Sequence, residues 1–331
     1  MDYKFLVNLD DHEGSGIKTK KRIAANGEVE EEMSSVQDGV GPHMMYNVTD
    51  TVMNKIVSGT TYDEVSSMSH EHRYGFETFF VDSGSMYVYI DGVRVIVKEG
   101  DILHLQPGQQ HAMASIEDVK FRGFFHDLDS FTDGMKNQEL TELMPELADD
   151  PDWGPTVMGG KDGIKRVRPY YEDVPAEQVH AVKHADRPVK AYKFDGVTAK
   201  IMVPRWENHG VCEYVLFEME PGFTANWVKF PSEREMYYVR SGKVKFTILG
   251  KEYIATKSCL VNIPKFAPHS VVALEKSEVY DMGGQTMWFS FLQDYVSLKH
   301  NEPEQFADPA VIADLKKKFK CDIESIGMTE V

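Results

Sequence analysis

The chain repeats part of its sequence at an offset of 158 residues, and this repeat limits the possible folds more than any other feature. The segment from Glu77 to His111 aligns without a gap to Glu235–His269 and shares eight identities with it over 35 positions. The shared residues include the acidic residue that opens each segment, the histidine that closes it, and the dipeptides Ser83-Gly84 and Ser241-Gly242. A repeat of this length indicates one structural domain that occurs twice.

Both copies have the pattern of short β-strands. The first contains apolar segments of three to five residues separated by glycines, namely Phe79–Val81, Met86–Ile90, Val93–Val97, Ile102–Leu105 and Phe121–Phe125. This spacing is typical of all-β domains with tight turns. Asp91-Gly92 predicts a hairpin, because Gly adopts a positive φ at little steric cost. The same pattern returns from about residue 191 to 292, so we expect an all-β fold.

The length of 331 residues suits two domains. We expect an N-terminal arm over residues 1–45, a first β-domain over 46–130, a connector over 131–190, a second β-domain over 191–300 and a C-terminal helix over 301–331. Apolar residues at helical spacing predict a further helix over 137–147, within the connector. Asp308-Pro309 predicts the start of the last helix, since Asp caps helices and Pro fits their first turn.

The composition excludes several classes of partner. Hydrophobic residues make up 42% of the chain, enough to build cores, while 36 basic and 53 acidic residues give a net charge of −17. Nucleic acid and anionic membrane are therefore not expected as partners. No apolar run approaches the ~20 residues of a membrane span, and no signal-peptide pattern is visible. Three scattered cysteines fit a reducing compartment, so we expect a cytoplasmic protein.

Four residues of the first copy have the spacing of metal ligands. His70 and His72 are two positions apart, so on a strand they project from one face. Glu77 follows across a short turn, and His111 comes from a strand 34 residues further on. Three imidazoles and one carboxylate suit a divalent transition metal and disfavour calcium. With only four protein ligands, positions stay open for a substrate, as in a catalytic site.

This pattern resembles the two motifs of the cupin superfamily. The first, G(X)5HXH(X)3–4E(X)6G, matches from His70 to Gly84 but has Glu64 in place of its leading Gly. The second, G(X)5PXG(X)2H(X)3N, matches at Gly100, Gly108 and His111, with its Pro one place late. The resemblance implies a double-stranded β-helix, or jelly roll, and the repeat implies a bicupin with a few flanking helices. It also implies His70, His72, Glu77 and His111 as ligands of one divalent metal per chain, with Mn, Fe or Zn expected.

The second copy lacks half of this ligand set. The positions that correspond to His70 and His72 hold Val228 and Phe230, which leaves only Glu235 and His269. Two ligands do not hold a catalytic metal against water. We therefore expect this degenerate second site to be structural, as a lid or an oligomerisation module. The alternative is a small-ligand or regulatory pocket that Glu235 and His269 form with Trp227 and Arg234.

Strand alternation assigns further residues to the first site. If Glu77 faces inward, so does Phe79, and in the next strand Met86, Val88 and Ile90 more readily line the barrel than the tyrosines between them. Alternation with Leu103 and Leu105 favours the opposite face of the sheet for His104. The candidates for proton transfer are Glu77, His104 and His126, and the candidates for substrate contact are Tyr74, Phe79 and Arg122. Tyr87 and Tyr89 suit an outer face through which a homo-oligomer could form.

The ligand set predicts a small enolisable substrate. Three imidazoles and one carboxylate leave about one positive charge on a divalent site, enough to bind an enolate and to acidify a water. We expect hydrolytic ring opening of a cyclic β-diketone such as a reduced phloroglucinol, a reaction of aromatic compound degradation. Two other reactions are open, a quercetinase-like dioxygenation of a polyphenol or β-diketone and an isomerisation or epimerisation. A non-catalytic metal-binding cupin, comparable to seed-storage proteins, is the fourth alternative.

Overall fold

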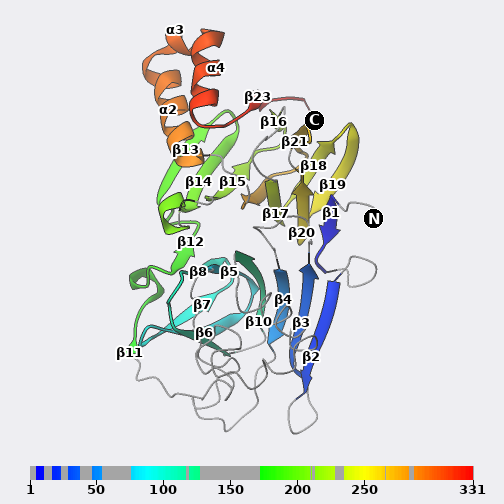
Figure 1. The fold of residues 1–331 in the computed structure, drawn as a ribbon, viewed down its shortest axis with the longest axis vertical. Helices are drawn as coiled ribbons and strands as arrows, with labels where there is room; N and C mark the ends of the chain where they lie inside the picture. Colours follow the sequence, from blue (N-terminus) through cyan, green and yellow to red (C-terminus); the bar gives the residue numbers. More distant parts are fainter. Residues whose placement is uncertain are drawn as a thin grey trace, which may run out of the picture. The chain divides into compact units, whose positions relative to one another are not determined.

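The computed structural model describes residues 5–10, 17–23, 29–37, 47–53, 76–116, 119–126, 172–208, 210, 213–227, 235–264, 266–282 and 287–330. The chain divides into two compact units (Figure 1). The N-terminal unit is His12–His184, and the C-terminal unit combines Met1–Asp11 with Ala185–Val331. Each unit is built from two β-sheets.

The N-terminal unit pairs a seven-stranded with a four-stranded sheet. The larger sheet has the order β12-β8-β5-β10-β4-β3-β2 and the smaller one β11-β7-β6-β9. The strands of the larger sheet are β2 (Ile17–Ile23), β3 (Val29–Gln37), β4 (Asn47–Met53), β5 (Phe76–Ser83), β8 (Asp101–Leu105), β10 (Val119–His126) and β12 (Val182–His184). Those of the smaller sheet are β6 (Ser85–Ile90), β7 (Val93–Lys98), β9 (His111–Ser115) and β11 (Glu172–Asp173).

The C-terminal unit has the same plan. Its seven-stranded sheet has the order β1-β20-β17-β22-β15-β14-β13 and its five-stranded sheet β19-β18-β21-β16-β23. The strands of the first sheet are β1 (Leu6–Asn8), β13 (Lys190–Phe194), β14 (Val197–Val203), β15 (Tyr214–Met219), β17 (Glu235–Ser241), β20 (Cys259–Ile263) and β22 (Ser277–Asp281). Those of the second are β16 (Phe223–Trp227), β18 (Lys243–Ile248), β19 (Lys251–Thr256), β21 (His269–Ala273) and β23 (Ile323–Met328).

The sequence repeat is also a structural repeat. The strands β6 to β9 of the N-terminal unit and β18 to β21 of the C-terminal unit have bounds that differ by the same 158 residues. The two larger sheets place corresponding strands in corresponding positions. The expectation of an all-β fold built from two jelly-roll barrels with a few helices is confirmed.

Each unit contains one strand from the chain segment that directly precedes the other barrel in sequence. β12 directly precedes the second barrel in sequence but pairs with β8 of the N-terminal unit. β1 precedes the first barrel but pairs with β20, the counterpart of β8 in the C-terminal unit, where Val7 faces Leu260. One of the two edge strands of each large sheet is thus supplied by the chain segment that leads into the other barrel.

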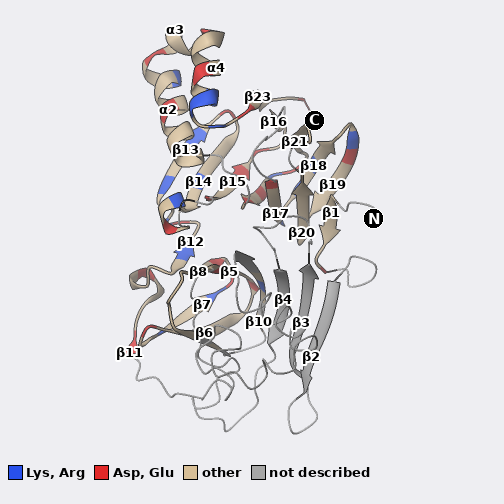
Figure 2. Cartoon of the chain, viewed as in Figure 1, with Lys and Arg blue, Asp and Glu red and all other residues tan. Residues whose placement is uncertain are grey.

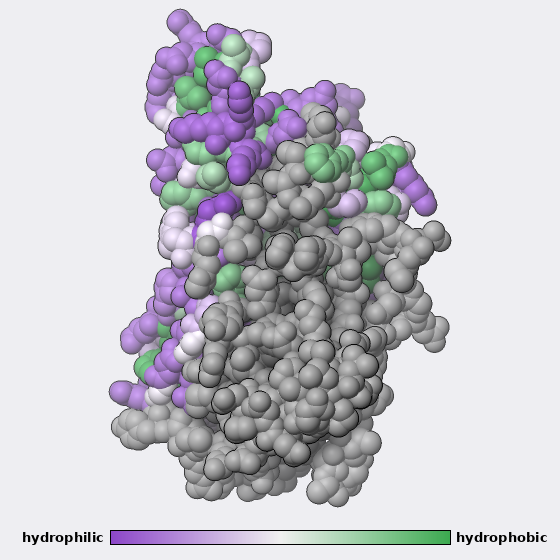
Figure 3. Space-filling model, viewed as in Figure 1, coloured by the Kyte–Doolittle hydropathy of each residue, from purple (hydrophilic) through white to green (hydrophobic). Residues whose placement is uncertain are grey.

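Three helices in the described part of the chain complete the C-terminal unit. They are α2 (Trp288–Asn301), α3 (Pro303–Phe306) and α4 (Pro309–Lys318). The side chain of Asp308 accepts a hydrogen bond from the backbone N–H of Ala310, as expected for the cap of the last helix. In Figure 3 the outer surface of these helices is mainly hydrophilic, while α2 buries Trp288, Phe291 and Leu292 in the core of the unit. None of the described helices is long and apolar enough to cross a membrane.

Three segments differ from the expected organisation. Residues 323–328, expected within the C-terminal helix, form the strand β23. Residues 17–23 and 29–37, expected within an arm, form β2 and β3 and extend the first sheet. Their many charged residues carry no apolar signal, but backbone pairing at the end of a sheet does not require one. Residues from Trp288 onward, where a strand pattern was expected to continue, form α2. The helix expected over 137–147 lies outside the described residues.

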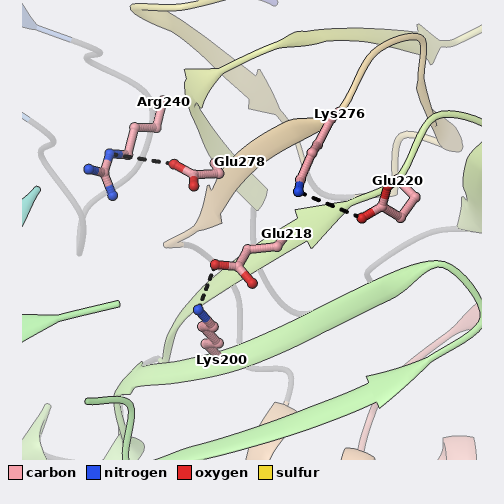
Figure 4. A network of polar contacts seen from close by, with 6 residues as sticks. All are labelled: Lys200, Glu218, Glu220, Arg240, Lys276 and Glu278. Atoms are coloured by element: carbon pink, nitrogen blue, oxygen red, sulfur yellow. Dashed lines mark hydrogen bonds and ion pairs between the residues drawn. The ribbon is translucent and has the colours of Figure 1, made fainter. Parts of the chain in front are cut away.

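Charged side chains on the C-terminal unit are arranged in pairs. Figure 2 shows basic and acidic residues interspersed over this unit, and Figure 4 shows three ion pairs close together. Lys200 lies 2.6 Å from Glu218, Arg240 lies 3.6 Å from Glu278, and Lys276 lies 4.0 Å from Glu220. Such pairs are partly exposed and add little stability. Because the glutamates already face cations, this cluster is not a candidate metal site.

Candidate metal centre

Glu77 and His111 meet inside the N-terminal barrel, as the sequence pattern predicts. Glu77 lies near the start of β5 in the larger sheet, and His111 opens β9 in the smaller one. Their side chains are buried, with Glu77 4% and His111 1% exposed. Oε2 of Glu77 is 2.9 Å from Nε2 of His111. A carboxylate and an imidazole from the two sheets therefore converge on one point.

The surroundings of His111 determine which of its ring nitrogens faces Glu77. Nδ1 lies 2.9 Å from the backbone oxygen of Gln109. A carbonyl oxygen only accepts hydrogen bonds, so Nδ1 carries a proton and Nε2 is the ring nitrogen that can bind a metal ion. Nε2 and the Glu77 carboxylate face each other across 2.9 Å, an arrangement that a proton or a metal ion between them stabilises. Two ligands at right angles on a metal, with bonds of about 2.1 Å, lie about 3 Å apart, so the spacing fits a shared metal.

The other two predicted ligands, His70 and His72, lie outside the described residues, as does Tyr74. The second copy shows which strand leads to the positions that correspond to His70 and His72. Trp227, the last residue of β16, pairs directly with His269 of β21. Positions 228 and 230, the counterparts of His70 and His72, follow this pair at once. The assignment of His70 and His72 as ligands stays a prediction that this register supports.

The described wall around Glu77 and His111 is apolar. Phe79, Val81, Leu103 and Leu105 share the inner face of the large sheet with Glu77, and the apolar residues predicted on β6 complete the core as Met86, Val88 and Ile90. The rings of Phe79 and Phe121 meet edge to face with centroids 5.5 Å apart. The described part of the wall therefore offers apolar contact to the carbon skeleton of a substrate.

Other predicted site residues belong to the opposite face of the large sheet. His104 pairs in register with Thr78 and lies 2.9 Å from its hydroxyl through Nδ1. Arg122 pairs in register with Phe80 and donates to Asp82 over 2.8 Å, fully buried. Strand alternation separates both side chains from Glu77. The structure thus does not bring His104 or Arg122 to the predicted metal centre.

His126 and the two tyrosines of β6 also have defined positions. His126 ends β10 and pairs with Phe76, one register position away from the pair of Phe125 with Glu77. Tyr89 is 4% exposed and therefore offers little surface to a partner. The ring of Tyr87 carries the guanidinium of Arg94 at 4.5 Å from its centroid. Only Tyr87 of this pair retains appreciable exposure for the expected oligomer contact.

The second barrel keeps two residues of the predicted ligand pattern. Glu235 and His269 are buried, and Nδ1 of His269 lies 3.0 Å from the oxygen of Ala267, the same contact that His111 makes. Burial lowers the pKa of His269 to about 4, which keeps its ring neutral. A separate apolar cavity in this barrel, lined in part by Tyr237 and Trp288 but by neither Glu235 nor His269, has a volume of about 30 Å³, room for about one water. No group of three potential metal ligands occurs among the described residues of the chain.

A buried polar cluster in the second barrel was not foreseen from the sequence. Asp281 is fully buried and accepts a hydrogen bond from the indole N–H of Trp288 over 3.0 Å. Burial, with the charge of Glu235 next, raises the pKa of the Cys321 thiol well above its usual value. Burial, followed by the charges of Asp281 and Glu235, likewise raises the pKa of Tyr237. Apolar residues of α2 and β23, such as Phe291 and Ile323, belong to the core of the same unit. Their spacing in the sequence is the signal that could have predicted this packing.

Comparisons with known proteins agree with the fold. Residues 62–125 match the family model of the cupin domain. No curated protein matches the chain. The chain is 14% identical to Lactobacillus farciminis oxalate decarboxylase in its formate complex, with a TM-score of 0.52 over 92% of this chain and 96% of that one. An oxalate decarboxylase structure on substrate binding mode and reaction specificity gives 15% identity and a TM-score of 0.52, over 86% and 78% of the two chains. A structure concerned with the Mn(II) centres of Bacillus subtilis oxalate decarboxylase gives 14% and 0.50, over 86% and 77%. At such identities the likeness shows the fold alone.

Proposed function

We propose that this chain, a bicupin of the cupin superfamily by its fold, is a metal-dependent enzyme that opens the ring of a small cyclic β-diketone by hydrolysis. The metal is one divalent transition ion in the N-terminal barrel, with Mn, Fe or Zn expected. His70, His72, Glu77 and His111 would hold it. The observation that carries the proposal is the buried approach of Glu77 to Nε2 of His111, 2.9 Å apart in an apolar barrel.

The apolar wall favours a diketone over a dicarboxylate. The similar structures are named as oxalate decarboxylases, and a substrate with two carboxylates would need cationic partners once it left water. Arg122, the cation predicted from the sequence at the site, bonds to Asp82 on the opposite face of the sheet. A six-membered cyclic diketone instead has one enolate face for the site and a carbon skeleton for Phe79 and Phe121. A reduced phloroglucinol has this form.

The residues of the chain have separable roles in such a reaction. A bound metal supplies Lewis acidity, which stabilises an enolate and acidifies water. Phe79 and Phe121 orient the ring through contact with its carbon face, and the packed wall excludes bulk water, which strengthens the electrostatic interactions inside. Water adds to one carbonyl carbon, the bond from that carbon to the α-carbon breaks, and the α-carbon takes up a proton to give an open-chain keto acid. Glu77, the buried carboxylate at this point, is the described group placed to pass that proton.

The reaction class can be tested with purified holoenzyme and a cyclohexane-1,3-dione substrate. Hydrolysis predicts full turnover under strict anoxia and one oxygen from H₂¹⁸O in the acid product. Loss of activity without oxygen, with label from ¹⁸O₂, would instead show a dioxygenase. An isomer of the substrate with solvent deuterium on carbon would show proton transfer alone. Turnover of oxalate with no turnover of diketones would overturn the substrate assignment.

A further inference from the structure

The loop that delivers His111 is held from outside the barrel by one carboxylate. Asp91, in the turn between β6 and β7, accepts hydrogen bonds from the side-chain amide of Gln109 over 3.1 Å and from the backbone N–H of Gln110 over 3.0 Å. The backbone N–H of Asp91 donates to the oxygen of Gln110 over 3.0 Å. Asp91 therefore bonds to both residues that precede His111.

Gln109 is fixed at several points by these contacts. Its side-chain oxygen accepts from the backbone N–H of Gln106 over 2.9 Å, while its side-chain amide donates to Asp91. Its own backbone N–H donates to the oxygen of Gln106 over 3.1 Å. The carbonyl of Gln109 is the group that accepts from Nδ1 of His111. The position of this carbonyl sets the plane of the imidazole and so the direction of the Nε2 lone pair.

The second barrel supplies an internal comparison without this carboxylate. The position that corresponds to Asp91 holds Leu249, which has a φ of +51° against +48° for Asp91. The backbone contacts persist there: Leu249 donates to the oxygen of Pro268 over 3.0 Å, and His269 Nδ1 lies 3.0 Å from the oxygen of Ala267. The side-chain bonds do not, because Leu249 has no carboxylate, Pro268 has no N–H and Ala267 has no side-chain amide. The carboxylate thus accompanies the barrel with the full ligand pattern and is absent from the degenerate one.

We infer that Asp91 is a positioning residue for the metal centre, which acts through Gln109 and Gln110 to fix the imidazole of His111 for metal binding. The backbone turn does not need the carboxylate, since Leu249 forms the same turn. The hydrogen bonds of the Asp91 carboxylate therefore stabilise the position of Gln109 and Gln110, the residues that precede His111. This inference rests on the proposed metal site in the N-terminal barrel.

Asp91→Asn tests the role with little disturbance of the backbone, because Asn tolerates a positive φ. It keeps one acceptor but turns an amide toward the amide of Gln109. We expect the dissociation constant for Mn(II), measured by equilibrium dialysis, to rise about tenfold, the lower end of the range for partners beyond the ligands. The Mn(II) EPR fine structure at saturating metal should change as well. Leu249→Asn, at the same turn of the second barrel, is the control and should leave both readings unchanged.

The outcomes separate this inference from the proposed function. Wild-type protein that binds no divalent metal at all would refute the proposed site itself. Wild-type protein that binds Mn(II), together with an Asp91→Asn variant of equal affinity and unchanged EPR spectrum, would refute only the role of Asp91. Gln109→Leu gives a second reading, since it removes both side-chain bonds of Gln109 and should weaken Mn(II) binding by a similar factor.

Discussion

Glu77 and Glu235 occupy equivalent positions of the repeat in two different surroundings. Substituting each in turn tests which of the two barrels binds the metal. Glu77→Gln should lower bound metal at least tenfold and activity by orders of magnitude, because it removes the anionic ligand next to His111. Glu235→Gln should leave about one metal per chain, because its barrel lacks the paired histidines. Elemental analysis of both purified variants checks this. Two metals per chain in wild-type protein, or the reverse order of the variants, would make the second barrel the active one.

His269 gives the C-terminal unit a pH dependence of known sign. Burial lowers its pKa from 6.5 to about 4, so between these values the unfolded chain binds more protons than the folded one. Stability is therefore present above pH 6.5 and is lost as the pH falls toward 4, by about 3 kcal/mol for a shift of this size. His269→Asn keeps a donor for the oxygen of Ala267 and should flatten this part of the profile. Thermal unfolding of both proteins at pH 4, 5, 6 and 7 measures the difference, and parallel profiles would contradict the assignment.

At the scale of residues, the sequence predicts the role of a residue best where the repeat contains the same residue twice. Glu77 and His111 could be predicted to meet because each has a strand position and a partner in the second copy. The separation of His104 from Glu77 also follows from strand alternation. The role of Asp91 could not be foreseen, since Asp-Gly signals a turn whatever the carboxylate bonds to. The distance to Gln109 is a property of two loops that only the folded chain brings together.

At the scale of elements, the link between β17 and β18 depends on a glycine. Gly242 has a φ of +82°, and a Cβ there would lie 2.3 Å from the backbone oxygen of Lys276. Gly242→Ala should cost more than about 2 kcal/mol of unfolding free energy, since neither the backbone nor the contact can relax cheaply. Gly250→Ala is the matched comparison, because Gly250 has a φ of +78° but nothing within 4 Å of its Cβ position. It should cost about 1 kcal/mol. Equal losses in chemical denaturation would show that crowding at Gly242 is unimportant.

Elements could be predicted where hydrophobic alternation and turn signals agree. The strands β5 to β9 satisfy both conditions, and the last helix has its Asp-Pro start. β2 and β3 escape such prediction because their strands consist largely of Lys, Glu and Ser. For α2 a signal exists: Trp288, Phe291, Leu292 and Tyr295 are spaced as one helical face, and all four are buried. Aromatic residues favour strands locally, which is why the periodicity is easily overlooked.

At the scale of the whole molecule, the pairing of β1 with β20 predicts that a substitution in β1 destabilises the second barrel, although β1 directly precedes the first barrel in sequence. Val7 is 4% exposed and pairs with Leu260 of β20. Val7→Asp would bury a charge there and should destabilise the C-terminal unit by several kcal/mol, while metal binding in the first barrel persists. Asn8→Asp adds the same charge at an exposed position of the same strand and serves as the control. Hydrogen exchange read by mass spectrometry should show faster exchange in β20 and β17 for Val7→Asp alone. Faster exchange confined to the first barrel would contradict the pairing.

The reciprocal exchange also sets the order in which the molecule can be completed during synthesis. β12 lies only about 80 residues beyond its partner β8, so the first barrel can close soon after that segment leaves the ribosome. β1 must wait until residues 259–263 have been made, which at 5–20 residues per second takes roughly 13 to 50 seconds. Through that interval β1 lacks β20 and exposes its backbone to other chains. A nascent chain of this protein is thus vulnerable to misassembly at β1, and the long separation between β1 and β20 favours slow completion of the second barrel.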